Sequence, residues 1–125
     1  LNLQGQSLNG SKILLCGVAY KKDINDIRES PALDVMKLLE EDGAEVEYYD
    51  PNVSEISWNG DTKPGLKNLS AETVTSFQAV IILADHSNVD YPLISDNADL
   101  IIDTRNVYSD INAENIIRLG VGRKK

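Results

Sequence analysis

The 125-residue sequence contains one Cys, one His, one Met, one Trp and one Phe. A lone Cys cannot form an internal disulfide, and a single His without a second ligand is poor support for a metal site. No apolar run approaches the roughly 20 residues of a membrane-spanning helix, and the polar first six residues do not match a secretory signal peptide. These absences favour a cytoplasmic protein without membrane spans or disulfides, and we expect no metal site.

Positive charge is also scarce, because 12 Lys and Arg face 20 Asp and Glu, for a formal net charge of −8. General binding to nucleic acid or to a membrane surface needs a basic face that collects phosphates. We therefore expect neither kind of partner. Any anionic ligand must be held by a local cluster of cations.

The composition, 42% hydrophobic and 26% charged, is typical of one compact globular domain of this length. The first residue is Leu rather than Met, so we expect the chain to be a piece of a longer protein. Such a piece can carry half of a binding site and none of the chemistry.

Short apolar runs alternate with helical patterns along the chain. Strands are predicted over residues 12–16, 45–50, 79–83 and 100–102, and helices over 31–42, from 71 and from 90. Residues 51–70 are predicted to form a surface excursion with a hairpin at Asn59-Gly60, and residues 115–120 an edge strand or irregular chain. Continuous apolar strands between helices predict a single α/β domain, a doubly wound, Rossmann-like and mainly parallel sheet with helices on both faces.

In such a sheet, ligands bind at the carboxyl ends of the strands, which places residues 18–28, 85–88 and 103–106 along one rim. This rim would bring together one aromatic residue and four cations: Tyr20, Lys21, Lys22, Arg28 and Arg105. Lys and Arg suit phosphate groups, and Tyr suits a nucleotide base. The cluster therefore indicates an anion such as a nucleotide diphosphate.

The competing interpretation is that these charges are solvated loop residues, with Asp23 and Asp26 pairing with Lys22 and Arg28. Composition and spacing alone favour this interpretation, since most charged loop residues are merely exposed. A phosphate-receiver domain has the same architecture, but it needs an acidic pair after the first strand, where this chain has a basic, aromatic loop.

Three other candidates carry less weight. Cys16 lies inside the first strand and is expected to be a small buried residue. His86 follows the third strand, where a loop-capping or ligand-edge position is favoured over general-base catalysis. Asp50-Pro51 follows the second strand where a dinucleotide-binding domain places its ribose-binding acid, but Gly17-Val18-Ala19 lacks the glycine fingerprint. Asp50 is therefore interpreted as turn chemistry.

The run KILLCGVAYKKDINDIRESP, residues 12–31, resembles the signature that opens the C-terminal, UDP-binding domain of the UDP-glucose/GDP-mannose 6-dehydrogenase family. Further matching stretches are GAEV at 43–46, YDP at 49–51, DH at 85–86 and DTRN at 103–106. The resemblance spans nearly the whole chain. Its details are most similar to the branch that oxidises UDP-N-acetylglucosamine or UDP-N-acetylmannosamine.

The resemblance implies a role for several rim residues. Tyr20 and Lys21 match the aromatic-Lys pair that contacts the UDP part of the substrate, and Arg105 matches an Arg that reaches the same ligand. Arg28 matches an Arg turned toward the cofactor NAD. Lys22 and His86 are expected at the edge of the ligand. No residue matches a catalytic group of the family.

The resemblance also implies a reaction. The complete enzyme oxidises the sugar C6 alcohol to a carboxylate in two hydride transfers, and its product serves the synthesis of surface polysaccharide precursors. It uses NAD, which is held mainly by an N-terminal domain. It also uses a reactive Cys, which Cys16 does not match. Residues 1–10 are similar to the end of the central-domain helix and its linker, and residues 11–125 to the UDP-sugar-binding domain. The chain is expected to be inactive alone and to work within a homo-oligomeric parent. The alternative is a free-standing, non-catalytic α/β module that binds a nucleotide or docks a protein.

Overall fold

The computed structural model describes residues 10–18, 31–58, 60–108 and 113–118. Its elements are β1 (Lys12–Cys16), α1 (Pro31–Glu41), β2 (Glu45–Tyr49), β3 (Glu55–Trp58), β4 (Asp61–Pro64), α2 (Ala71–Thr75), β5 (Ala79–Ile82), α3 (Tyr91–Asn97), β6 (Ile101–Asp103) and β7 (Ile116–Arg118). The predicted strands and helices are present within a residue or two of their expected bounds. The edge strand foreseen near the carboxyl end is β7.

Five strands form one sheet in the order β2-β1-β5-β6-β7, and every neighbouring pair is parallel. The chain moves outward from β1 to β2 and then crosses back to β5 on the other side of β1. The boundary between β1 and β5 is therefore the topological switch point, the usual ligand position in a doubly wound sheet. The predicted fold class is confirmed.

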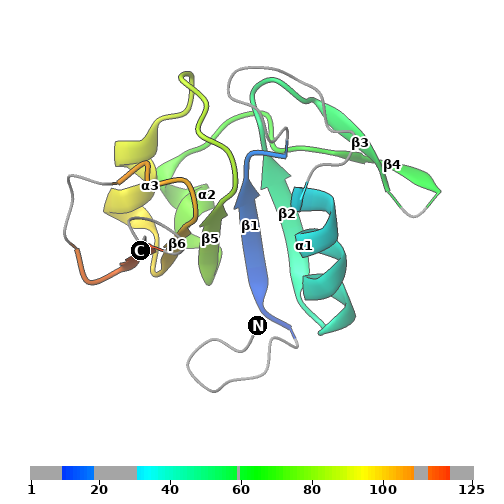
Figure 1. Ribbon diagram of the computed structural model, residues 1–125, viewed down its shortest axis with the longest axis horizontal. Coiled ribbons are helices and arrows are strands. Elements are labelled where there is room, and N and C mark those ends of the chain that lie inside the picture. The colour runs from blue at the N-terminus through cyan, green and yellow to red at the C-terminus, as the bar shows by residue number, and fades with distance from the viewer. Residues whose placement is uncertain (1–9, 19–30, 59, 109–112, 119–125) are drawn as a thin grey trace, which may run out of the picture.

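Helices cover both faces of the sheet, with α1 on one side and α2 and α3 grouped on the other (Figure 1). Alternate residues of β1 enter separate cores: Ile13 and Leu15 pack with Met36 of α1, whereas Leu14 packs with Ile94 of α3. Because successive strand residues point to opposite faces, a continuous apolar run supplies both cores at once.

Local sequence signals place the ends of the helices. Gly43 has a φ of +95° and donates its N–H to the Glu40 carbonyl at 3.0 Å, which ends α1. Ser70 accepts the Thr73 N–H at 3.1 Å, and Asp90 accepts the Leu93 N–H at 3.1 Å, so each caps the helix that follows.

The predicted hairpin is present, because β3 and β4 pair in antiparallel register around residues 59–60. The hairpin leaves the end of β2 and extends past α1 (Figure 1). The expectation of a simple surface excursion is wrong for its inner face, since Val53 and Ile56 are buried in the core under α1. Trp58 also donates its indole N–H to Glu40 at 2.9 Å, which attaches the hairpin to that helix.

Candidate functional site

The carboxyl ends of β1, β5 and β6 lie level with one another. Cys16 is in register with Ile82, and Ile82 is in register with Asp103. The residues that follow these strands therefore share one rim, as predicted, for the part of the rim that the structure describes. Arg105 is exposed on this rim. Tyr20, Lys21, Lys22 and Arg28 lie outside the described residues, so their positions stay predictions.

The chain after β1 and the chain after β5 approach each other closely at Gly17 and Ala84. Gly17 has a φ of +94°, and a Cβ built on it would lie 2.6 Å from the Ala84 Cβ and 2.9 Å from the Ala84 nitrogen. The Gly17 N–H donates to the Tyr49 carbonyl at 2.8 Å, on the other side of β1. Only a residue without a side chain fits between these strand ends.

The turn that presents Arg105 is organised by Asp103, whose side chain is fully buried. One carboxylate oxygen accepts the N–H groups of Arg105 and Val107 at 3.0 and 3.2 Å, and the other accepts the Tyr108 N–H at 2.9 Å. Asn106 adopts a φ of +63° within this turn. Asp103 was not singled out from the sequence, although Asp and Asn three residues apart are a turn signal.

A second buried carboxylate belongs to Asp50, at the end of β2. Its Oδ1 accepts the Asn52 N–H at 2.9 Å, which confirms the predicted turn chemistry. Its Oδ2 accepts the Val18 N–H at 2.8 Å and contacts His86 Nε2 at 3.2 Å. His86 is at the predicted rim, but its side chain is fully buried. Sequence reasoning missed this pair because its members are 36 residues apart.

Two tyrosines connect the end of β5 with the turn after β6. Tyr108 donates its hydroxyl to the Tyr91 carbonyl at 2.8 Å, and the two rings meet edge to face at 6.0 Å. The Tyr91 hydroxyl accepts the His86 N–H at 2.9 Å and donates to the Ala84 carbonyl at 3.1 Å. Hydrogen bonds thus extend across the rim from Asp103 to Asp50.

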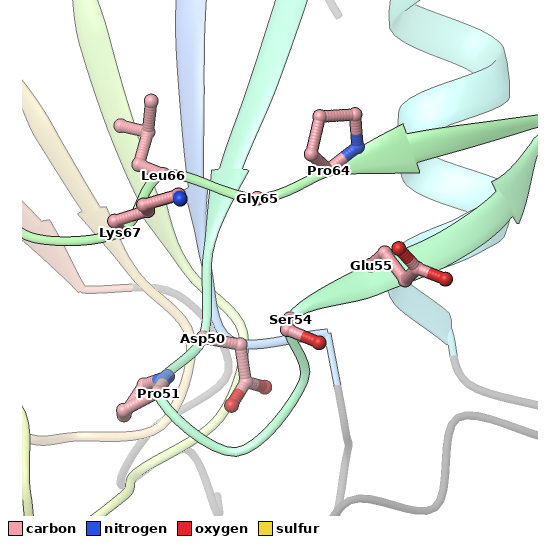
Figure 2. Close-up of a pocket in the computed structure, with 8 residues that line it drawn as sticks. All are labelled: Asp50, Pro51, Ser54, Glu55, Pro64, Gly65, Leu66 and Lys67. Atoms are coloured by element: carbon pink, nitrogen blue, oxygen red, sulfur yellow. The ribbon is translucent and has the colours of Figure 1, made fainter.

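A pocket of about 500 Å³ opens beside the end of β2. Figure 2 shows its lining residues converging from the end of β2, the start of β3 and the exit of β4. Its charged lining residues are Lys67, Asp50 and Glu55. A diphosphate needs several converging cations, so this lining does not suit one.

Cys16 is buried as predicted, with no exposed area. Burial, assisted by the charge of Asp50, raises the pKa of the Cys16 thiol from 9.0 to about 12. Burial is also the main cause that raises the pKa of Tyr48 to about 12 and the pKa values of Tyr91 and Tyr108 above 10.0. A thiol held protonated in this way is a poor nucleophile.

These raised pKa values predict a loss of stability in alkali. Above about pH 9 the unfolded chain releases protons that the folded chain still holds, so the unfolded state binds fewer protons and the free energy of unfolding falls. The stability that these protonated Cys and Tyr groups contribute is fully present below about pH 9 and is lost as the pH rises through their folded-state pKa values. Urea denaturation between about pH 8 and pH 11 measures the slope. Cys16→Ala should flatten the slope, and equal slopes in both proteins would contradict the assignment to Cys16.

Within the described part of the chain, no group of three or more His, Cys, Asp or Glu is arranged to hold a metal ion. None of the helices described there has both the length and the apolar character needed to cross a bilayer.

The fold and the rim define a doubly wound α/β domain whose ligand position is the switch point between β1 and β5. The family model described as "UDP-glucose/GDP-mannose dehydrogenase family, UDP binding domain" matches residues 14–110. The chain therefore belongs to this family, as its UDP-binding domain, and the resemblance found in the sequence is confirmed.

Relatives of the chain are named as dehydrogenases. It is 51% identical over 49 residues to UDP-glucose 6-dehydrogenase 2 of Arabidopsis thaliana, which covers 39% of this chain and 10% of the relative. It is 36% identical over 75 residues to the UDP-N-acetyl-D-mannosamine dehydrogenase of Methanococcus maripaludis, which covers 60% of this chain and 16% of the relative. The chain thus spans a small part of these curated relatives.

The fold matches a solved structure of the UDP-N-acetyl-mannosamine dehydrogenase from Staphylococcus aureus, with a TM-score of 0.63 and 34% sequence identity. The match covers 89% of this chain and 26% of that chain. The shared part is therefore one domain of a larger dehydrogenase.

Proposed function

We propose that this chain, within residues 11–125, is the UDP-sugar-binding domain of an NAD-dependent dehydrogenase that oxidises the C6 alcohol of a UDP-N-acetylhexosamine. The observation that carries the proposal is the rim at the switch point, where the exit of β1 and the Arg105 turn lie on either side of β5. These two strand ends are two strand spacings apart, about 10 Å, a span that a nucleoside diphosphate can bridge.

The proposal assigns Tyr20 and Lys21 to the UDP moiety from the β1 side and Arg105 from the β6 side. Arg28 is assigned to the side facing NAD and Lys22 to the edge of the ligand. His86 stands at that edge, but its side chain is fully buried. The stretches 84–87 and 103–108 support the N-acetylhexosamine branch by resemblance, and the likeness to a solved UDP-N-acetyl-mannosamine dehydrogenase agrees with it.

The described residues do not fit an NAD site of their own. Asp50 has the position of a ribose-binding acid, but both of its carboxylate oxygens already accept backbone N–H groups. The buried Cys16 is also unsuited to hold a covalent intermediate. We therefore propose that NAD and the reactive Cys belong to other domains of the parent enzyme, including the domain to which residues 1–10 lead. We propose that this parent is cytoplasmic and homo-oligomeric. This chain alone is then inactive.

Removing the rim cations should weaken UDP binding. We expect Lys21→Ala and Arg105→Ala each to weaken binding of UDP and UDP-N-acetylglucosamine by about tenfold or more, since each loses a charge-assisted hydrogen bond to phosphate. Isothermal titration calorimetry of the chain measures both ligands.

The matched control is Lys12→Ala, which removes the same charge at the amino end of β1, the opposite edge of the sheet. It should bind UDP like the parent chain. Unchanged affinity in Lys21→Ala and Arg105→Ala, or UDP binding no tighter than that of inorganic phosphate, would overturn the site assignment.

A further inference from the structure

The buried pair formed by Asp50 and His86 lies on the rim at the carboxyl ends of β2 and β5. Asp50 is 4% exposed and His86 is 0% exposed. Their contact of 3.2 Å joins the carboxyl ends of β2 and β5, and the Val18 N–H reaches the same Asp50 oxygen from the end of β1 at 2.8 Å. One carboxylate oxygen thus holds three adjacent strand ends at the switch point.

Both ring nitrogens of His86 face polar groups of the protein. Asn52 Nδ2 lies 3.4 Å from His86 Nδ1, and Asp50 accepts at Nε2. A ring that carries a proton on Nε2 donates to the carboxylate, and an unprotonated Nδ1 accepts from the amide. The His86 backbone is held as well, through its N–H and the Tyr91 hydroxyl at 2.9 Å.

A buried carboxylate is unfavourable unless hydrogen bonds compensate its lost hydration. Here those bonds come from the chain itself, so Asp50 and His86 are engaged with one another and with the backbone. At the usual ligand position, both carboxylate oxygens of Asp50 and both ring nitrogens of His86 contact groups of the protein. This geometry suits residues that hold neighbouring residues of the site in position and do not bind the ligand themselves.

We propose that Asp50 and His86 are positioning residues of the UDP site. By holding the Val18 N–H, the pair fixes the backbone at Val18, which precedes Tyr20 and Lys21 in the chain, and it acts on the site without itself contacting the ligand. The inference rests on the proposed function for its effect on UDP. Its effect on the β1 exit is independent of any ligand.

Asp50→Asn is the first test. The amide keeps the shape of the carboxylate but replaces one acceptor oxygen by a donor, so either Val18 or Asn52 loses its acceptor. We expect UDP to bind about tenfold more weakly, because the residues that contact UDP would no longer be held in the position that binding needs. Ile13→Val, a buried change at the amino end of β1, should lower the melting temperature without changing UDP affinity.

His86 is tested by two substitutions of different chemistry. Gln offers an amide N–H that can donate to Asp50, whereas Leu offers none. His86→Gln should therefore retain more UDP affinity than His86→Leu when both are measured below their melting temperatures. Equal losses in the two variants would show that the hydrogen bond to Asp50 does not matter for the site.

A double-mutant cycle separates positioning from general weakening of the fold. If Asp50 acts through Lys21, the loss in Asp50→Asn combined with Lys21→Ala is smaller than the product of the single losses. Asp50→Asn combined with Arg105→Ala should come closer to the simple product, since the Arg105 N–H is held by a different carboxylate. A simple product in both combinations would overturn the proposal.

Hydrogen exchange decides the same question without ligand. In Asp50→Asn, peptides covering residues 17–30 should exchange faster than in the parent chain, while peptides from α2 and α3 change little. A uniform acceleration over the whole chain would overturn the positioning assignment. If the parent chain fails to bind UDP while this local effect appears, the proposed function fails and the positioning of the β1 exit stands.

Discussion

Replacing Gly17 by Ala should lower the free energy of unfolding by about 3 kcal/mol or more. A side chain at φ +94° carries a conformational penalty of roughly 1 to 2 kcal/mol. The added Cβ would also lie 2.6 Å from the Ala84 Cβ and 2.9 Å from its backbone nitrogen, so overpacking adds roughly 1 to 3 kcal/mol. Urea denaturation followed by circular dichroism measures the difference.

The matched control for Gly17 is Gly60→Ala in the β3–β4 hairpin. Gly60 has a φ of +79°, and nothing lies within 4 Å of a Cβ built there. Gly60→Ala therefore pays the conformational penalty alone, roughly 1 to 2 kcal/mol. If the two substitutions proved equally destabilising, the close contact between the β1 and β5 ends would be refuted.

Gly17 also shows what the sequence alone can reveal. The strand predicted over residues 12–16 is β1, which ends directly before Gly17, and the helix predicted over residues 31–42 is α1, which ends at Glu41. These predictions succeed because a turn is decided by residues adjacent in sequence. The contact with Ala84 depends on which strand lies beside β1, and that order appears only when the sheet is assembled.

In the candidate site, too, the features that depend on neighbouring residues were predictable, and those that depend on contacts between distant residues were not. The rim was predicted because the carboxyl ends of parallel strands meet at one edge regardless of their order. The Asp50–His86 pair was missed, because turn chemistry explains Asp50 locally and nothing near His86 in sequence points to β2. Val53 and Ile56 were assigned to the surface for a similar reason, since Gly, Pro and Asn around them are typical of loops while their burial depends on α1.

Asp103 is the buried residue on which the Arg105 side of the site depends, and Asp103→Asn should destabilise the chain by about 3 kcal/mol. The carboxylate accepts three backbone N–H groups, two on one oxygen and one on the other. The Asn amide has one acceptor oxygen and one NH2 group. At least one of the three N–H groups therefore faces the NH2 group and loses its hydrogen bond. Each unsatisfied buried group costs about 1 to 3 kcal/mol, and more where the lost partner is charged.

The same substitution should weaken UDP binding, because the turn that presents Arg105 loses at least one of the three N–H contacts that hold it. Asp90→Asn is the matched control: it makes the same chemical change at the exposed cap of α3, where Asn caps as well as Asp and the loss of stability should be close to zero. Binding is compared at a temperature where every variant is folded. If Asp103→Asn unfolds at lower urea but binds UDP like the parent chain, Asp103 supports the fold alone. If its effect on UDP disappears in an Arg105→Ala background, it acts by placing Arg105.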